Sequence, residues 1–333
     1  MNGKVLSSIF YGVLGLVVVF LNKTVLTRYK YDTSVLSSVS IVSNCRFPAF
    51  SVLGTLQAIT IITVLRLAKV FKIVNFPDFS MSVVKQIFPL PIFYVINLLS
   101  SLGATKRLNL PMYVVLRRFG ILITMILQIY FLNIIPSKRA AIAIFVIIAG
   151  SVFAALEDLN FDMIGYFFIL LYDLFDSCEA ILVKMQLNDR KSVGQIGILY
   201  YCALFSFLPL CLFVLITGDY QKAFVNYEGW NDISFVCLFF SCSLASATFL
   251  YAYIMCTDYN NPVLSQVIAC MRNILTTYIG MYVGGDYIFN LYNFIALNLT
   301  MFAAFYYTYI NLTETEKSDA SKSESNEKLL NEV

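Results

Sequence analysis

Three arginines lie within apolar stretches of the chain, where a fixed positive charge needs a partner. Arg117 and Arg118 share one such stretch, and Arg272 lies in another, where Asn273 follows it as a second polar group. A cation at membrane depth costs a few kcal/mol at least, so it usually faces a polar cavity and binds something. Because the two arginine positions match in the two halves of the chain, they predict a transporter built from repeats that holds an anionic cargo.

An intramembrane ion pair that fixes helix packing is the alternative explanation of these arginines. Arg117 and Arg118 are adjacent, and consecutive side chains on a helix point about 100° apart. We therefore expect at most one of them to face a cavity, while the other pairs or extends toward the membrane interface.

A polar stripe marks the apolar stretch 163–187. On a helix its members fall within one sector of about 140°, and they are Tyr172, Asp173, Asp176, Ser177, Glu179 and Lys184. Since the rest of the stretch is apolar, we expect the stripe to face the protein interior. The acids could pair with the arginines in the empty state, or they could bind a cation or a proton. Lys184 could instead simply end its span at the interface.

Tyr200 and Tyr201 lie near the start of another apolar stretch, 194–217. A tyrosine ring at a cavity wall can stack on a planar base and donate a hydroxyl hydrogen bond. Tyrosine is also common in the interfacial belt of membrane proteins. Because the chain contains 22 tyrosines, position alone leaves both interpretations open.

The composition predicts an all-α integral membrane protein. Of the 333 residues, 59% are hydrophobic and 13% charged, and the mean hydropathy is +0.77. We expect ten spans of roughly 16–25 residues. They are 6–22, 50–70, 87–103, 112–132, 138–156, 163–187, 194–217, 234–257, 262–283 and 289–310.

These spans form one predicted transporter domain, 1–311, with halves of about 1–156 and 157–311. The polar tail 312–333 is expected to be a disordered cytosolic segment. Lys and Arg residues outside the spans favour cytosolic termini. Basic residues after the first span, beginning with Lys23, are an exception and could form a mouth that attracts the cargo.

Several function classes are excluded or disfavoured by composition. The chain has no histidine, which excludes histidine acid–base chemistry and histidine-ligated metals. Its eight cysteines form no CxxC pair and are interpreted as buried apolar residues, so neither a metal nor a disulfide is expected. A net charge of +3 is too weak to indicate a nucleic-acid partner. No enzyme is expected, because no catalytic loop is visible, and no cofactor is expected.

Several runs of residues match the pattern of a known family. They include 21–27 (LNKTVLT), 88–91 (FPLP), 105–119 (TKRLNLPMYVVLRRF) and 284–289 (GGDYIF). In these runs the chain resembles the nucleotide-sugar transporters of solute carrier family 35, subfamily D. The similarity covers nearly the whole chain apart from the tail.

The resemblance implies a ten-helix drug/metabolite transporter fold with two inverted five-helix repeats. It implies an antiporter in the Golgi or endoplasmic reticulum membrane that imports UDP-sugars, such as UDP-glucuronate or UDP-N-acetylgalactosamine, by alternating access. The implied partners are the nucleotide sugar, a nucleoside monophosphate and the lipid bilayer; a homodimer is left open. The alternatives are a transport-inactive paralogue that acts as a binding or regulatory subunit, or a carrier of another phosphorylated metabolite.

The resemblance also assigns site residues. Tyr200 and Tyr201 fit a motif that reads the nucleotide, and Arg272 and Asn273 fit a motif that meets the phosphates and sugar. In the stripe, Asp173 matches the family, and so does Lys184, which completes the candidate substrate-binding set.

This chain departs from the family pattern at other positions. Arg272 stands where the family has lysine, Cys202 where it has asparagine, and the acids Asp176 and Glu179 where it has uncharged polar residues. These changes could alter the preference for sugar or base. Residues 31–45 are additional to the pattern and are either a longer lumenal loop or a gene-model error.

Overall fold

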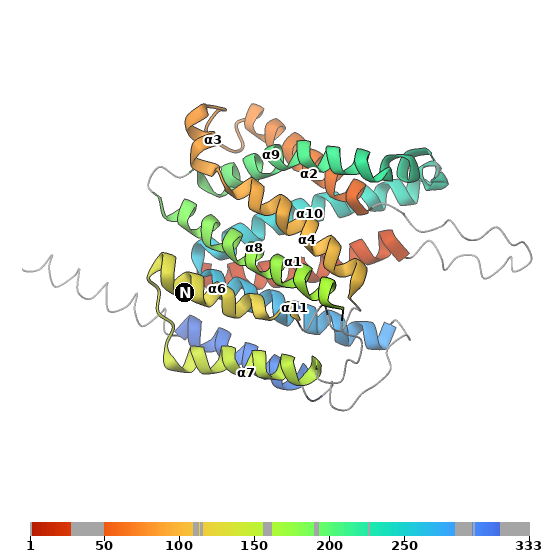
Figure 1. The fold of residues 1–333 in the computed structure, drawn as a ribbon. Coiled ribbons are helices and arrows are strands. Elements are labelled where there is room, and N and C mark those ends of the chain that lie inside the picture. Colours follow the sequence, from red (N-terminus) through yellow and green to blue (C-terminus); the bar gives the residue numbers. More distant parts are fainter. Residues whose placement is uncertain are drawn as a thin grey trace, which may run out of the picture. The chain divides into compact units, whose positions relative to one another are not determined.

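The computed structural model of the chain describes residues 2–27, 50–108, 113, 116–155, 162–189, 193–225, 227–283, 295 and 297–313. Helices dominate these ranges, which contain no β-strand (Figure 1). The helices are α1 (Asn2–Thr27), α2 (Phe50–Val70), α3 (Met81–Ile87), α4 (Leu90–Arg107), α6 (Phe119–Leu132), α7 (Lys138–Ala155), α8 (Met163–Asn188), α9 (Gly194–Thr217), α10 (Ile233–Tyr259) and α11 (Pro262–Val283). Residues 297–313 are also helical. The predicted all-α class is confirmed.

Most predicted spans coincide with a helix. The bounds of α2, α9 and α11 are those expected from the apolar runs, and α8 extends only one residue further. The predicted loop 31–45 lies outside the described residues, as does the predicted tail except for 312 and 313, which continue the last helix.

Three differences separate the described helices from the predicted spans. The first is α3, which was not predicted and whose first turn is capped, since the Ser80 hydroxyl accepts the Val83 N–H at 3.3 Å. The second is the predicted span 87–103, whose helix begins later, at Leu90, after the cis peptide bond Phe88–Pro89. Arg117 and Arg118 form a turn that opens α6, rather than lying inside a helix 112–132.

Four segments of the described chain are apolar and long enough to cross a membrane, judged by length and composition. They are Gly3–Leu21, Ser51–Val70, Gly194–Thr217 and Ile233–Tyr259. The apolar helix α6 is shorter.

The chain divides into two compact units, each built from separate stretches of sequence. Unit 1 contains Met1–Gly12, Ile96–Lys184 and Cys256–Val333, and unit 2 contains Val13–Val95 and Met185–Met255. Each unit thus draws on both of the halves predicted from the sequence. The division of the transporter domain into those two halves stays a prediction.

In unit 2, α2 packs against α9. Its core contains Val52, Leu53 and Val214, together with the aromatic side chains of Phe235 and Phe239. At one end of α2 the Lys69 ammonium donates a hydrogen bond to the Asp78 carboxylate at 2.6 Å, and this bond lowers the pKa of that exposed carboxyl.

In unit 1, α6 (yellow in Figure 1) packs against both α7 and α11. A buried apolar cluster beside it consists of Ala104, Leu108, Leu116, Ile169 and Tyr172. Leu116 of this cluster directly precedes Arg117, so its packing against α8 fixes the position of the two arginines that follow it.

Gly165 allows the start of α8 to approach this cluster closely. A Cβ at Gly165 would lie 2.8 Å from Leu108 Cδ2 and 3.0 Å from Leu108 Cγ. Leu108 is buried, so we expect Gly165→Ala to cost about 1–3 kcal/mol of stability by overpacking. The measurement is the thermal unfolding midpoint of purified protein in detergent.

The matched control is Gly54→Ala in α2, where a Cβ would meet nothing within 4 Å. Alanine is favoured over glycine in a helix by about 1 kcal/mol, so this control should keep or raise the midpoint. Equal midpoints for the two variants would contradict the close approach of α8 to Leu108.

Candidate anion-binding site

Arg117 and Arg118 are placed by the turn that precedes α6. The Arg117 N–H donates to the Tyr113 carbonyl at 3.1 Å, and the Ile121 N–H donates to the Arg118 carbonyl at 3.1 Å. The two guanidinium groups therefore belong to the amino end of α6, where the helix dipole also favours negative charge. This end of unit 1 concentrates positive potential from three sources.

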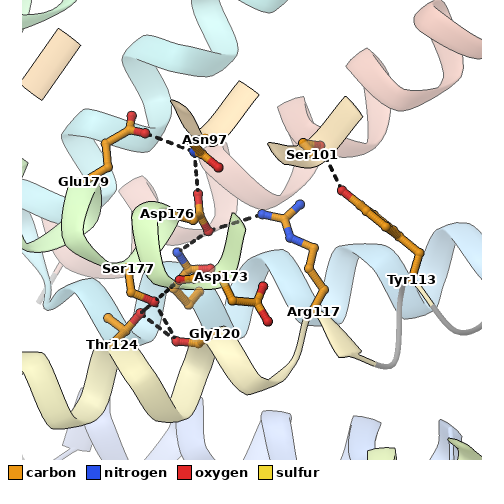
Figure 2. Close-up of polar contacts among 11 residues, drawn as sticks. Asn97, Ser101, Tyr113, Arg117, Gly120, Thr124, Asp173, Asp176, Ser177 and Glu179 are labelled. Carbon is orange, nitrogen blue, oxygen red and sulfur yellow. Dashed lines mark hydrogen bonds and ion pairs between the residues drawn. The ribbon is translucent and has the colours of Figure 1, made fainter. Parts of the chain in front are cut away.

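Arg117 is held by a carboxylate and an aromatic ring of α8. Its Nη2 lies 3.2 Å from Asp176 Oδ2, and its guanidinium carbon lies 4.3 Å from the centroid of the Tyr172 ring. The side chains of Arg117 and Asp176 are 22% and 19% exposed, so solvent screens this ion pair only in part. The expected pairing of a stripe acid with an arginine is thus found at Asp176 (Figure 2).

Asp176 is the centre of a polar network. Its Oδ2 also accepts a hydrogen bond from Gln266 Nε2 at 2.9 Å, and its Oδ1 accepts one from Asn97 Nδ2 at 3.3 Å. The same Asn97 amide donates to Glu179 Oε2 at 3.1 Å (Figure 2). Glu179, the third acid of the stripe, therefore contacts an amide instead of an arginine.

Asp173 lies one turn before Asp176 and contacts the backbone of α6. It is 1% exposed, and a Cβ at Gly120 would lie 3.3 Å from its Oδ1. Beside it, the Thr124 hydroxyl donates to Ser177 Oγ at 2.9 Å, and Ser177 Oγ lies 3.0 Å from the Gly120 carbonyl. Asp173 and Ser177 are buried, which confirms that the stripe faces the interior.

Arg118 is buried among neutral groups. It is 3% exposed, and its Nη1 donates to Ser151 Oγ at 3.1 Å and to Thr300 Oγ1 at 3.2 Å. Its Nε and Nη2 are buried and have no hydrogen-bond partner among the described residues. Arg118 therefore offers donors to an incoming acceptor, whereas Arg117 is occupied by Asp176.

A small cavity in unit 1 brings the arginine pair together with α11. Its lining consists of Arg117, Arg118, Ile121, Gln266, Ala269, Cys270 and Asn273. Its volume of about 20 Å³ admits a water molecule but is far below that of a nucleotide site. Both arginines line this space, and Arg117 also forms the ion pair that was expected for one of the two.

Arg272 takes a different direction from its neighbour Asn273. Its guanidinium carbon lies 6.0 Å from the centroid of the Tyr11 ring on α1, at the limit of a cation–π contact. Asn273 lines the cavity with Arg117 and Arg118. Of the two residues predicted on α11, Arg272 and Asn273, it is Asn273 that lines the same cavity as the arginines at 117 and 118.

Lys184 is buried, and its ammonium group donates to the backbone carbonyl of Asp258 on α10. This burial argues against the alternative that Lys184 ends a span at the interface. Lys23 falls near the end of α1, and its side chain lies outside the described residues.

The two predicted nucleotide-reading tyrosines belong to unit 2. Tyr200 and Tyr201 are 7% and 1% exposed and pack on Phe76, whose ring centroid lies 4.7 Å from that of Tyr200. The Tyr201 hydroxyl donates to the Pro77 carbonyl at 2.8 Å. Their role in reading a nucleotide stays a prediction.

The sequence reasoning missed the uncharged residues that position the charged ones. They are Asn97, Gln266, Ser151 and Thr300. Asn97 and Gln266 could have been predicted, because amide side chains within apolar stretches are expected to hydrogen-bond to a neighbouring helix.

The comparisons with known proteins agree with this architecture. Residues 9–308 match the Triose-phosphate Transporter family. A solved structure, described only as the crystal structure of a protein, has a TM-score of 0.64 and 13% identity, covering 93% of this chain and 98% of that one. At this identity the match shows the fold alone.

Three relatives align along most of their length. UDP-sugar transporter sqv-7 of Caenorhabditis elegans is 37% identical, covering 92% of this chain and 88% of the relative. UDP-sugar transporter UST74c of Drosophila melanogaster is 35% identical, covering 95% and 80%. Nucleotide sugar transporter SLC35D2 of Homo sapiens is 33% identical, covering 94% and 88%. The chain is therefore a multi-pass membrane protein of the Triose-phosphate Transporter family and, within it, of solute carrier family 35, subfamily D.

Proposed function

We propose that this protein is an antiporter that imports a UDP-sugar from the cytosol into the lumen of the Golgi or endoplasmic reticulum and returns a nucleoside monophosphate. The relatives' names support transport of nucleotide sugars. The observation that carries the proposal is the cavity in unit 1 that Arg117, Arg118 and Asn273 line together.

The chemistry of this cavity suits a phosphate group. A phosphate loses much hydration when it enters an apolar protein, and fixed cations compensate for that loss. The Nε–H and Nη2–H groups of Arg118, which have no hydrogen-bond partner among the described residues, form a planar fork that matches two phosphate oxygens. The Asn273 amide can add a hydrogen bond to a further oxygen or to a sugar hydroxyl.

The finer features of the predicted transporter belong to this proposal. They are ten spans in two inverted repeats, with halves of about 1–156 and 157–311, a cytosolic tail 312–333 and both termini in the cytosol. In this scheme Arg272 approaches the phosphates, Tyr200 and Tyr201 stack on the base, and Asp173 and Lys184 support the site. Lys23 attracts the anionic cargo. Alternating access then delivers the cargo across the membrane.

The proposal is tested by counterflow with purified protein in liposomes. Liposomes loaded with UMP should take up at least one radiolabelled UDP-sugar from a panel that includes UDP-glucuronate and UDP-N-acetylgalactosamine. GDP- and CMP-sugars serve as competitors. A well-folded protein that exchanges none of these compounds would instead support a transport-inactive paralogue, and uptake of other phosphorylated metabolites alone would support the second alternative.

Arg272 provides a sharper test of the predicted phosphate contacts. We expect Arg272→Ala to abolish counterflow, because truncation of a buried charged contact costs about 2–5 kcal/mol. Arg272→Lys should keep partial activity, since the charge remains and the planar fork is lost. The control is Arg139→Ala, which removes an exposed arginine at the start of α7. Normal counterflow by well-folded Arg272→Ala would remove Arg272 from the site.

Ser151 tests how Arg118 is positioned. Its hydroxyl accepts from Arg118 and also bonds the Ile147 carbonyl of its own helix at 2.8 Å. Ser151→Ala should cost about 1–3 kcal/mol of stability because buried Arg118 loses one of its two described acceptors, and should raise the half-saturating UMP concentration. The control is Ser243→Ala, since the buried Ser243 hydroxyl bonds the Phe239 carbonyl of its own helix at 3.1 Å. Identical unfolding and UMP affinity in both variants would contradict the positioning role.

A further inference from the structure

Asp176 pairs with Arg117, one of the arginines that would bind the cargo phosphate. Its Oδ2 lies 3.2 Å from Arg117 Nη2 and thus accepts from a group to which a phosphate oxygen could bond instead. Arg117 and Gln266, which both contact that oxygen, line the cavity, so Asp176 is bonded directly to two residues of the cavity wall.

The carboxylate is fixed in this position by neutral donors. Gln266 and Asn97 donate hydrogen bonds to its two oxygens at 2.9 and 3.3 Å. Neither donor carries a charge, so the positive charge of Arg117 balances that of Asp176. Arg118, by contrast, has described contacts with neutral groups only.

The ion pair lies within a single compact unit. Arg117 and Asp176 both belong to the stretch Ile96–Lys184 of unit 1. The pair can therefore persist whatever arrangement unit 2 adopts. This matters for an exchanger, because a carrier that returns empty must bring its site through a water-poor state, where an unbalanced charge is costly.

We propose that Asp176 is an internal counter-ion that competes with the cargo phosphate for Arg117 and lets the empty carrier reorient. This inference rests on the proposed function. It implies two linked properties: the protein catalyses net uptake as well as exchange, and the carboxylate weakens the binding of nucleotide anions. Removing the charge should tighten nucleotide binding and make exchange obligatory.

The experiment uses radiolabelled UMP, the proposed exchange partner of every UDP-sugar. Uptake is measured into liposomes that contain unlabelled UMP and into empty liposomes. For Asp176→Asn we expect the ratio of net uptake to exchange to fall about tenfold below that of the unaltered protein, and the half-saturating UMP concentration to fall about tenfold. Exchange at saturation should remain.

The control is Asp162→Asn, which removes a carboxylate paired with another arginine, Arg107 at 3.5 Å, away from the residues that line the cavity. This variant should keep the ratio and the affinity of the unaltered protein. Asp176→Ser provides a second charge removal, and size-exclusion profiles establish that each variant is folded.

The outcomes separate the two proposals. If the unaltered protein exchanges no UMP or UDP-sugar, the proposed function fails. If it exchanges but shows no net uptake, or if folded Asp176→Asn and Asp176→Ser keep the original ratio and affinity, the counter-ion role alone is overturned. Loss of exchange in a folded Asp176 variant also overturns it, because Asp176 would then be required for binding the cargo.

Discussion

The structure of unit 1 depends on keeping two guanidinium groups in an apolar bundle. The protein meets the cost of burial in two ways: Arg117 receives a carboxylate and a Tyr172 ring, and Arg118 receives two hydroxyls. The carboxylate balances the charge of Arg117, whereas the two hydroxyls only hydrogen-bond one nitrogen of the Arg118 guanidinium. Because a buried charge is expensive without full compensation, this asymmetry makes Arg118 the stronger attractor for an anion.

Close helix packing makes this arrangement possible. The lack of a side chain at Gly120 brings the first turn of α6 against Asp173, and the hydroxyls of Thr124 and Ser177 join the same two helices one turn further on. Asp176 then follows on the same face of α8, where it reaches Arg117 in the turn before α6. A bulkier residue at 120 would separate α6 from α8 and lengthen the ion pair between Arg117 and Asp176. This ion pair therefore depends on the glycine.

The sequence predicted the helices well because the ends of long apolar runs coincide with the ends of helices, as at α9 and α11. Helical periodicity also predicted that the stripe of α8 faces inward. The sequence did not predict which residue each acid of the stripe would contact. Asp173 and Asp176 share a face, yet one meets a glycine backbone and the other an arginine, because neighbours in a bundle change within one turn. Asn97 lies 79 residues from Asp176 in the sequence, and no local pattern joins them.

The size of the cavity connects these features to transport. A space of about 20 Å³ cannot hold a nucleotide, so a cargo phosphate can enter only if lining side chains move. The contacts available to move are the hydrogen bond from Gln266 and the ion pair from Arg117, both of which end on Asp176 Oδ2. In the proposed mechanism, a phosphate that takes the Arg117 guanidinium leaves Asp176 hydrogen-bonded to its two amide donors but without a balancing charge. Cargo binding and internal pairing then compete for one guanidinium. The amides of Asn97 and Gln266 keep the displaced carboxylate hydrogen-bonded, and its unbalanced charge weakens the binding of the anion.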